Sequence, residues 1–579
     1  MICFESHIDS NVVTFFNENK KTLSNVDNIN SLLKKVSGIN DFFSSSKETE
    51  ELLSRLENYN SIVEEPNRRE YGDFQTNKDL TNQVTNYISS KSENFEFILE
   101  PTCGKGNFIL ASISQFKTIK KIVGVEIYQP YVWETKFKLL SFFLENSNRT
   151  KPNIDIIHAN AFEFPYEEIA NKTKHLQTLI IGNPPWVTNS ELGTIDSTNL
   201  PQKSNFKKHK GFDALTGKGN FDIGEYISLI MLKHFGKHNG TFAFLIKNSV
   251  IRNITHDQIN KQYQISNSEK LNIDSKKEFN VSVNASLFLT TLNQEPDFIC
   301  KELDFYTHKK ITTFGWYKDK FVNSIKDYDE TSEIDGKSSF VWRSGIKHDC
   351  SKIMEFERVN GHFVNGLKQE LKLEKELVFG LLKSSDLKDS ETNQFRKLTI
   401  VTQKKIGAKT NYIKSDYPLT FDYLNRNKEY FDKRKSSIYK DKPSFSIFGV
   451  GDYSFTPFKI GISGMYKTTH FTLIKPEKGK PIMLDDTCYF IGFQDLKMAK
   501  IAHYLVNSKV SQKFLKSIIF SDSKRSINKD ILMRIDFKTL YDKIGFNSIS
   551  NDLKGLTESE WTKFGGLIKK TPDLQMKIF

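Results

Sequence analysis

Between residues 66 and 298, short apolar runs of strand length alternate with segments of helical spacing. Such an alternation folds into a mostly parallel sheet with helices on both faces, because consecutive parallel strands need a crossover connection. The predicted strands lie in FEFILE, KKIVGVEI, IDIIHAN, TLIIGN, GTFAFLIKN and ASLFLTTL. The pattern therefore predicts an α/β domain, whose ligands would bind beyond the carboxyl ends of the strands.

The rest of the chain has different patterns. Residues 1–65 carry helical apolar spacing, as in Leu32, Leu33 and Val36, and are predicted to form a helical extension. From residue 299 onward the apolar runs are short and are mixed with aromatic residues, basic clusters and glycine turns. Because 579 residues exceed one ordinary core, residues 299–579 are predicted to form a second domain of mixed α+β structure.

Charge and cysteine usage restrict the class of protein. The chain has 83 Lys and Arg against 70 Asp and Glu, and this excess favours an acidic partner such as nucleic acid, unless it reflects a Lys-rich composition alone. The five cysteines are far apart and form no Cys-x-x-Cys pair, so neither a disulfide framework nor a metal site is indicated. With no long apolar segment, we expect a cytoplasmic protein that does not span a membrane.

A glycine turn follows the first predicted strand, in EPTCGKGNF at residues 100–108. Gly104 and Gly106 let the backbone approach a ligand closely, and the helix that starts there supplies free N–H donors. The next strand ends at Glu126, where doubly wound folds place an acid on a ribose diol. Each feature also has an ordinary structural explanation, but together they favour an adenosine-type cofactor.

The strand TLIIG leads into Asn183, Pro184, Pro185 and Trp186. Proline stiffens this segment and removes an N–H donor, so the segment offers carbonyl acceptors on a rigid backbone. The Asn183 side-chain oxygen and the Pro184 carbonyl oxygen could both accept protons from an exocyclic amino group and make its nitrogen nucleophilic. Trp186 could stack on the ring that bears this amino group; a packed surface turn is the alternative.

These motifs resemble those of the amino-group DNA methyltransferases that use S-adenosyl-L-methionine, most closely the N6-adenine type of gamma motif order. In that order the cofactor motifs come first, Asn-Pro-Pro-aromatic follows, and the target-recognition domain is C-terminal. The resemblance implies a Rossmann-like class I methyltransferase sheet in residues 66–298 and a DNA target-recognition domain in residues 299–579. It also implies direct methyl transfer to an adenine flipped out of double-stranded DNA, without a metal.

The resemblance extends to individual positions. Asn77 replaces a proline in the segment that helps to hold the methionine carboxylate, and Asn160 stands where the family has an Asp that contacts the cofactor's adenine. The residues implied to bind the cofactor are Phe74, Thr76, Glu100, Pro101, Thr102, Gly104, Gly106, Phe108, Glu126, Asn160, Ala161 and Asn183. The implied catalytic residues are Asn183, Pro184, Pro185, Trp186 and Phe279, with Phe279 as a second aromatic on the flipped base.

Two further segments are similar to the family. One, at residues 217–251, would place Asp222 and Asn248 near the pocket. The other comprises basic and aromatic stretches of the C-terminal half, in which Lys459, Lys524 and Arg525 are the predicted DNA contacts. We therefore expect the protective methylase of a type II restriction-modification system, which would pair it with a cognate restriction endonuclease acting on the same site.

Alternative functions share parts of this pattern. Cytosine-N4 methyltransferases use the same chemistry but more often carry Ser-Pro-Pro. Glutamine-N5 methyltransferases of proteins also use Asn-Pro-Pro-aromatic, but they are short and lack a large basic C-terminal domain. A non-catalytic DNA-binding protein is disfavoured by the intact motifs. A fused nuclease is disfavoured because the N-terminal extension has no convincing Asp and Glu-x-Lys cluster.

Overall fold

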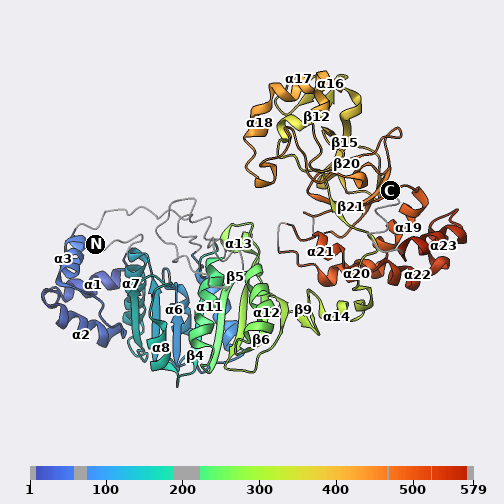
Figure 1. Ribbon diagram of the computed structural model, residues 1–579. Helices are drawn as coiled ribbons and strands as arrows, with labels where there is room; N and C mark the ends of the chain where they lie inside the picture. Colours follow the sequence, from blue (N-terminus) through green and yellow to red (C-terminus); the bar gives the residue numbers. More distant parts are fainter. Residues whose placement is uncertain (1–7, 58–74, 188–221, 466–467, 523–524, 570–579) are drawn as a thin grey trace. The chain divides into compact units, whose positions relative to one another are not determined.

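The computed structural model describes residues 8–57, 75–187, 222–465, 468–522 and 525–569 (Figure 1). The chain forms two compact units, Met1–Phe321 and Val322–Phe579. None of the helices in the described ranges combines the length and the apolar character needed to cross a membrane. The predicted α/β fold with a further mixed α+β part is confirmed by the sheets and helices of these units.

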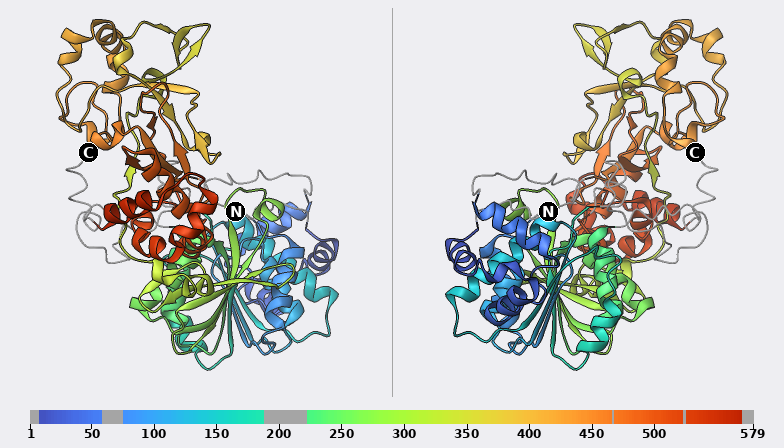
Figure 2. Two further views of the ribbon diagram at one scale, coloured as in Figure 1. Left: turned by 90° about the vertical axis from the view of Figure 1, so that its right-hand side faces the viewer. Right: turned by 90° about the vertical axis from the view of Figure 1, so that its left-hand side faces the viewer.

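The first unit contains a ten-stranded sheet with the order β10-β9-β8-β6-β7-β5-β4-β1-β2-β3. Strands β5, β4, β1, β2 and β3 are parallel to one another, whereas β7 is antiparallel to both β5 and β6. Helices lie on both sides of the sheet (Figure 2). The strands are β1 (Phe97–Glu100), β2 (Lys121–Glu126), β3 (Asn153–His158), β4 (Thr178–Gly182), β5 (Gly240–Lys247), β6 (Ile265–Asn272), β7 (Ala285–Leu292), β8 (Ile299–Asp304), β9 (Lys310–Tyr317) and β10 (Lys320–Val322).

Each parallel strand is followed by a helix that returns the chain to the start of the next strand. These helices are α6 (Asn107–Gln115), α7 (Gln129–Glu145), α8 (Tyr166–Thr173), α11 (Ile223–Phe235) and α12 (Asn248–Lys261), and α5 (Lys78–Ser89) precedes β1. Strands β1 and β4 are buried at every position, as expected for central strands covered on both faces. The carboxyl ends of β1, β2 and β4 therefore open onto a common edge of the sheet.

Two N-terminal helices, α1 (Ser10–Glu18) and α2 (Val26–Ser37), pack on the outside of α7, and α3 (Ser46–Glu57) packs against the short helix Thr22–Ser24. The Phe16 and Phe137 rings meet edge to face with their centroids 6.1 Å apart, and the ring centroids of Phe43 and Trp133 are 5.8 Å apart. The ammonium of Lys136, which is 7% exposed, donates to the Phe42 carbonyl at 2.8 Å. The extension thus adds to the hydrophobic core of the first unit.

The second unit contains two smaller sheets and two groups of helices. Its six-stranded sheet has the order β14-β13-β12-β17-β15-β20, and its five-stranded sheet has the order β11-β21-β18-β19-β16. The strands are β11 (Arg343–Ser344), β12 (Glu355–Val359), β13 (His362–Asn365), β14 (Glu370–Leu371), β15 (Val378–Leu382), β16 (Glu391–Thr392), β17 (Lys397–Ile400), β18 (Phe458–Ser463), β19 (Thr472–Ile474), β20 (Met483–Leu484) and β21 (Cys488–Phe493). The main helices are α17 (Pro418–Arg426), α18 (Lys428–Asp432), α19 (Leu496–Asn507), α20 (Lys509–Ile518), α22 (Phe537–Asp552) and α23 (Glu558–Ile568).

The connection between the units lies further along the chain than the predicted domain boundary at residues 298 and 299. Strand β8 pairs in parallel with β6, and β9 pairs antiparallel with β8, so both extend the large sheet. The compact units separate after Phe321. The division into an extension, a catalytic domain and a recognition domain remains a functional prediction.

Candidate functional site

The glycine turn after β1 has the backbone that the sequence predicts. Gly104 and Gly106 have φ of +50° and +72°, in the left-handed region that favours glycine. A Cβ at Gly104 would come within 2.7 Å of Gln75 Oε1, and one at Gly106 within 2.6 Å of Thr135 Cγ2. The turn therefore cannot carry side chains at these positions without a shift, and α6 starts directly after it.

Glu126, at the end of β2, is held by backbone donors. Its Oε2 accepts from the Gly104 N–H at 2.8 Å, and its Oε1 accepts from the Tyr128 N–H at 2.8 Å. The residue is 8% exposed. Because each carboxylate oxygen can accept more than one hydrogen bond, these donors orient the group and leave it able to accept from hydroxyl groups of a ligand.

Glu100 ends β1 and lies deeper, at 2% exposure. Burial first, and the charge of Glu126 second, raise the pKa of the Glu100 carboxyl well above its ordinary value. Within the described residues, Glu100 Oε2 has no hydrogen-bond partner. Such a buried acceptor is costly unless a ligand donor satisfies it.

Asn183 and the prolines follow β4 at the same edge of the sheet. The Asn183 Nδ2 donates to Thr76 Oγ1 at 3.1 Å, and the Asn107 Nδ2 donates to the Thr76 carbonyl at 2.7 Å. Thr76 is 5% exposed, and this pair of bonds ties the segment before α5 to the start of α6 and to the residue that follows β4. With Nδ2 donating to Thr76, the amide oxygen is the acceptor that Asn183 can direct to a substrate.

The Pro-Pro segment is also fixed from the other side. The Ile223 N–H donates to the Val187 carbonyl at 2.9 Å at the start of α11. Asp222 caps this helix by accepting from the Gly224 N–H, and it forms an ion pair with Lys247 at 2.7 Å. Asp222 therefore lies beside the pocket, where it caps the start of α11. The Asn248 side chain instead accepts from Ser286 Oγ at 2.7 Å, on β7.

Trp186 and Phe279 contact one another. Trp186 is 4% exposed, and its Nε1 donates to the Leu245 carbonyl at 3.1 Å. The two rings meet edge to face, with their centroids 4.8 Å apart and an interplanar angle of 71°. Rings in this contact leave no room for a base between them. The two aromatic residues expected on a flipped base are thus neighbours, but in this arrangement they pack as part of the core.

Most of these groups line one pocket, whose empty space of about 990 Å³ includes open solvent. The predicted residues that line it are Thr76, Glu100, Pro101, Thr102, Gly104, Phe108, Glu126, Asn160, Ala161, Asn183, Pro184 and Pro185. Gly106 belongs to the adjoining turn, whereas Trp186 and Phe279 are not among the lining residues. Phe74 lies outside the described residues.

Several contributors were not predicted from the sequence. Gln75 accepts from the Lys105 N–H at 3.2 Å, and Thr135 Oγ1 donates to the Gly104 carbonyl at 2.9 Å. Both support the glycine turn from other parts of the chain. Tyr128 and Tyr131 line the pocket beside Glu126. Their position directly after the strand that ends in Glu126 is the sequence signal that could have identified them.

The predicted DNA contacts lie in different environments. Lys459 is completely buried on β18, where its Nζ donates to the Thr456 carbonyl at 2.8 Å, so its prediction as a DNA contact is wrong for this structure. Arg525 has a side chain that is 49% exposed and lies 3.4 Å from Asp486. Lys524 lies outside the described residues.

Comparison with a solved structure supports the class of fold. The chain is similar to the Type IIL restriction-modification enzyme MmeI, solved in complex with DNA, with a TM-score of 0.53 over 99% of this chain and 91% of that one. At 13% identity, this similarity shows a shared fold. Together with the glycine turn and the pocket at the strand ends, it defines the class as a methyltransferase fold with an additional C-terminal part.

Sequence comparison shows the family. Residues 56–284 match the model of the N-6 DNA methylase family. The Type II methyltransferase M.NspV of Nostoc sp. is 38% identical over 478 residues, which are 82% of this chain and 98% of that protein. The chain therefore belongs to the N-6 DNA methylases of type II restriction-modification systems, as its motifs predict. S-adenosyl-L-methionine is the methyl donor of this family.

Proposed function

We propose that this chain is a site-specific adenine-N6 methyltransferase of double-stranded DNA, acting on an adenine that is turned out of the duplex. Its modification would protect the DNA from a cognate restriction endonuclease. The observation that carries the proposal is the placement of Asn183 and Pro184 on the wall of the pocket, with the Asn183 amide held by Thr76. A base within a duplex could not present its amino group to such a recessed site.

The residues of the pocket fit S-adenosyl-L-methionine. Glu126 offers two oriented carboxylate oxygens to a ribose diol, and Glu100 offers a buried acceptor to an ammonium group. The glycine turn removes side chains where a ligand would approach the backbone. When bound, this cofactor supplies an electrophilic methyl group on a sulfonium. Asn160 and Ala161 line the part of the pocket where we place the adenine of the cofactor.

The proposed catalytic groups of the chain are acceptors. The Asn183 amide oxygen and the Pro184 carbonyl oxygen would accept hydrogen bonds from the two hydrogens of the adenine N6 amino group. This draws the nitrogen lone pair out of conjugation with the ring and increases its nucleophilicity. The prolines stiffen the backbone here and Thr76 holds the Asn183 amide, so we propose that both acceptors act by orienting the amino group.

Trp186 and Phe279 would stack on the flipped base only after their rings separate. Trp186→Ala should weaken the extruded state by about 1–3 kcal/mol, because base–aromatic contact is lost, whereas Trp186→Phe should retain most of it. The fluorescence rise of a duplex with 2-aminopurine at the target position measures this state. An equal rise in the parent and in Trp186→Ala would exclude Trp186 from base stacking.

Adenine is favoured over its alternatives by Asn183, since cytosine-N4 enzymes more often carry serine there. The second unit of 258 residues, from Val322 to Phe579, disfavours glutamine-N5 methylation of a protein. Mapping modified bases in DNA from cells that express the chain decides between these reactions. We expect N6-methyladenine at one sequence; N4-methylcytosine, or unmodified DNA with a methylated protein, would contradict the proposal.

A further inference from the structure

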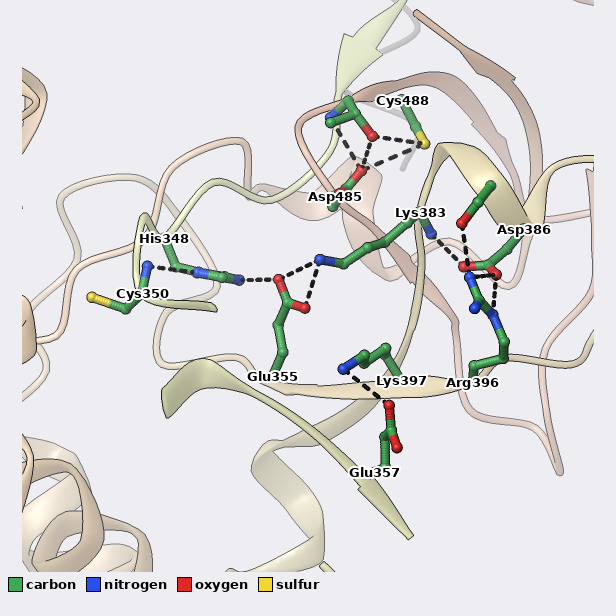
Figure 3. A network of polar contacts seen from close by, with 12 residues as sticks. His348, Cys350, Glu355, Glu357, Lys383, Asp386, Arg396, Lys397, Asp485 and Cys488 are labelled. Carbon is green, nitrogen blue, oxygen red and sulfur yellow. Dashed lines mark hydrogen bonds and ion pairs between the residues drawn. The ribbon is translucent and has the colours of Figure 1, made fainter. Parts of the chain in front are cut away.

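The two faces of the six-stranded sheet in the second unit differ in whether their cations form ion pairs. On one face, Lys383 pairs with Glu355 at 2.6 Å and Lys397 pairs with Glu357 at 3.0 Å (Figure 3). Glu355 also lies 3.5 Å from His348 Nε2. The positive charges of this face are therefore neutralised inside the unit.

The opposite face carries a second pocket, of about 660 Å³ including open solvent. Because side chains alternate along a strand, Arg358 and Leu398 point away from Glu357 and Lys397 and into this pocket. Its charged lining residues are Arg358, Lys375, Lys478, Lys480 and a single carboxylate, Glu477. Among the described residues, none of these four cations takes part in an ion pair within 4.0 Å, so the pocket keeps an excess of positive charge.

Two tight turns are close in sequence to lining residues of this pocket. Asn360 and Gly361 join β12 to β13 with φ of +50° and +86°, and Lys478 and Gly479 have φ of +50° and +80°. Glu477 and Lys480 exchange backbone hydrogen bonds of 3.0 and 2.9 Å across the second turn. Positive φ at both central residues is typical of rigid two-residue turns. A Cβ on either glycine would meet nothing within 4 Å, so both turns project into open space.

Lys480 is fixed at the wall of the pocket. Its Nζ donates to the Lys375 carbonyl at 2.6 Å and lies 4.2 Å from the centroid of the Phe379 ring. Partial burial lowers the pKa of this ammonium, although the charge of Glu376 opposes the shift. The Arg358 guanidinium lies 5.6 Å from the Phe363 centroid. Arg358, Lys375 and Lys478 are exposed, whereas Lys480 is half-buried, and a bound anion would compensate the charge of this group.

We propose that this pocket of the six-stranded sheet binds a backbone phosphate of the DNA substrate. The proposal deepens the proposed function and depends on it, because it assumes that DNA is the substrate. Double-stranded DNA supplies anions at regular spacing, and exposed Arg and Lys side chains next to aromatic rings suit contacts to its backbone. Such a contact positions the duplex without reading its sequence.

The test compares two double variants of the full-length protein that remove the same charge. Arg358→Gln with Lys478→Gln alters the pocket; Lys428→Gln with Lys433→Gln alters α18, where these lysines pair with Asp432 and Glu429. Binding to two fluorescent duplexes of equal length is measured over a series of salt concentrations. One duplex carries the methylated sequence found by base mapping, and the other lacks it.

We expect the pocket variant to bind both duplexes more weakly and to lose about 0.9 of the log–log salt slope for each phosphate contact removed. The α18 variant should lose less. Equal slopes in the two variants would overturn the proposal, as would a loss restricted to the methylated sequence, which indicates base reading. Binding of inorganic phosphate at the pocket with an unchanged DNA slope would overturn it too. Failure of the parent to methylate DNA would overturn the proposed function itself. If the parent methylates DNA but the pocket variant keeps the salt slope of the parent, only the phosphate site is overturned.

Discussion

Two pockets in the described residues both lie near residues of positive φ but carry opposite charge. The pocket of the first unit lies at the ends of parallel strands and contains Glu100 and Glu126 beside glycines of positive φ. The pocket of the second unit lies on a sheet face between tight turns and contains Arg358 and Lys480. We propose that the carboxylates bind a ligand with hydroxyl and amino groups, whereas the cations without ion pairs bind phosphate.

Lys459 differs from the cations of the second pocket, because it is completely buried and no ligand can reach it. Desolvation lowers its pKa to about 7. The unfolded chain, with a lysine pKa of about 10.4, therefore binds the proton more strongly between about pH 7 and pH 10, and stability should rise with pH in this window. The penalty is fully present below pH 7 and corresponds to about 5 kcal/mol at most.

Lys459→Met should therefore stabilise the second unit most at neutral pH and below, and little near pH 10. Denaturant unfolding of the parent and the variant at several pH values measures the difference. Lys397→Met, at an ion pair on the other sheet, is the matched control and should not gain stability. An identical pH dependence of the parent and of Lys459→Met would show that the ammonium is hydrated in the native state.

Asn183→Ala tests the proposed catalytic role of the pocket in the first unit. It should lower the rate of methyl transfer by about a hundredfold or more, about 2.7 kcal/mol, because one of two acceptors of the amino group is lost. Single-turnover assays measure the rate, with Asn86→Ala on the exposed face of α5 as the control. A near-normal rate in Asn183→Ala would remove this residue from the catalytic groups.

Glu126→Ala should act on binding, with a smaller effect. Loss of the charge-assisted bonds to a ribose diol should weaken S-adenosyl-L-methionine binding by about 1.5–3 kcal/mol. Titration calorimetry measures this change, and Glu145→Ala, at the exposed end of α7, provides the control. If affinity is unchanged in Glu126→Ala, the role of this carboxylate is confined to holding the Gly104 and Tyr128 backbone.

Many residues that the sequence singled out line the pocket of the first unit, because the signals for their placement are local. Apolar runs such as TLIIG end directly at the candidate site residues, so one segment of sequence predicts both the strand and the site. Strand β6 was missed, because ISNSEKLN has few apolar residues; its buried Glu269 is compensated by the Tyr87 hydroxyl at 2.6 Å, and Tyr87 lies far away in the sequence. Long-range compensation of this kind leaves no local pattern.

Lys459 illustrates the same limit in the second unit. It alternates with Phe458 and Ile460 along β18, and this pattern suggests a solvent-facing position. In the fold both faces of the strand are covered: at the neighbouring Gly461, which shares the face of Lys459, a Cβ would lie 2.9 Å from Ile474 and 3.0 Å from Leu484. The covering residues come from elsewhere in the chain, and one sequence does not specify which strands are covered twice.

Replacement of Arg525 should have the smallest effect on DNA binding. It tests whether a cation outside the second pocket also contacts the DNA backbone. Its side chain is 49% exposed, and an exposed pair such as that with Asp486 contributes little to stability. Arg525→Gln should therefore leave folding intact and, if one phosphate contact is lost, reduce the salt slope of DNA binding by up to about 0.9. Asp486→Asn keeps Arg525 and removes its anionic neighbour, so it should strengthen DNA binding slightly. If both variants match the parent in affinity and slope, Arg525 faces solvent in the complex, and the phosphate contacts of the second unit must come from other cations such as Arg358 and Lys478.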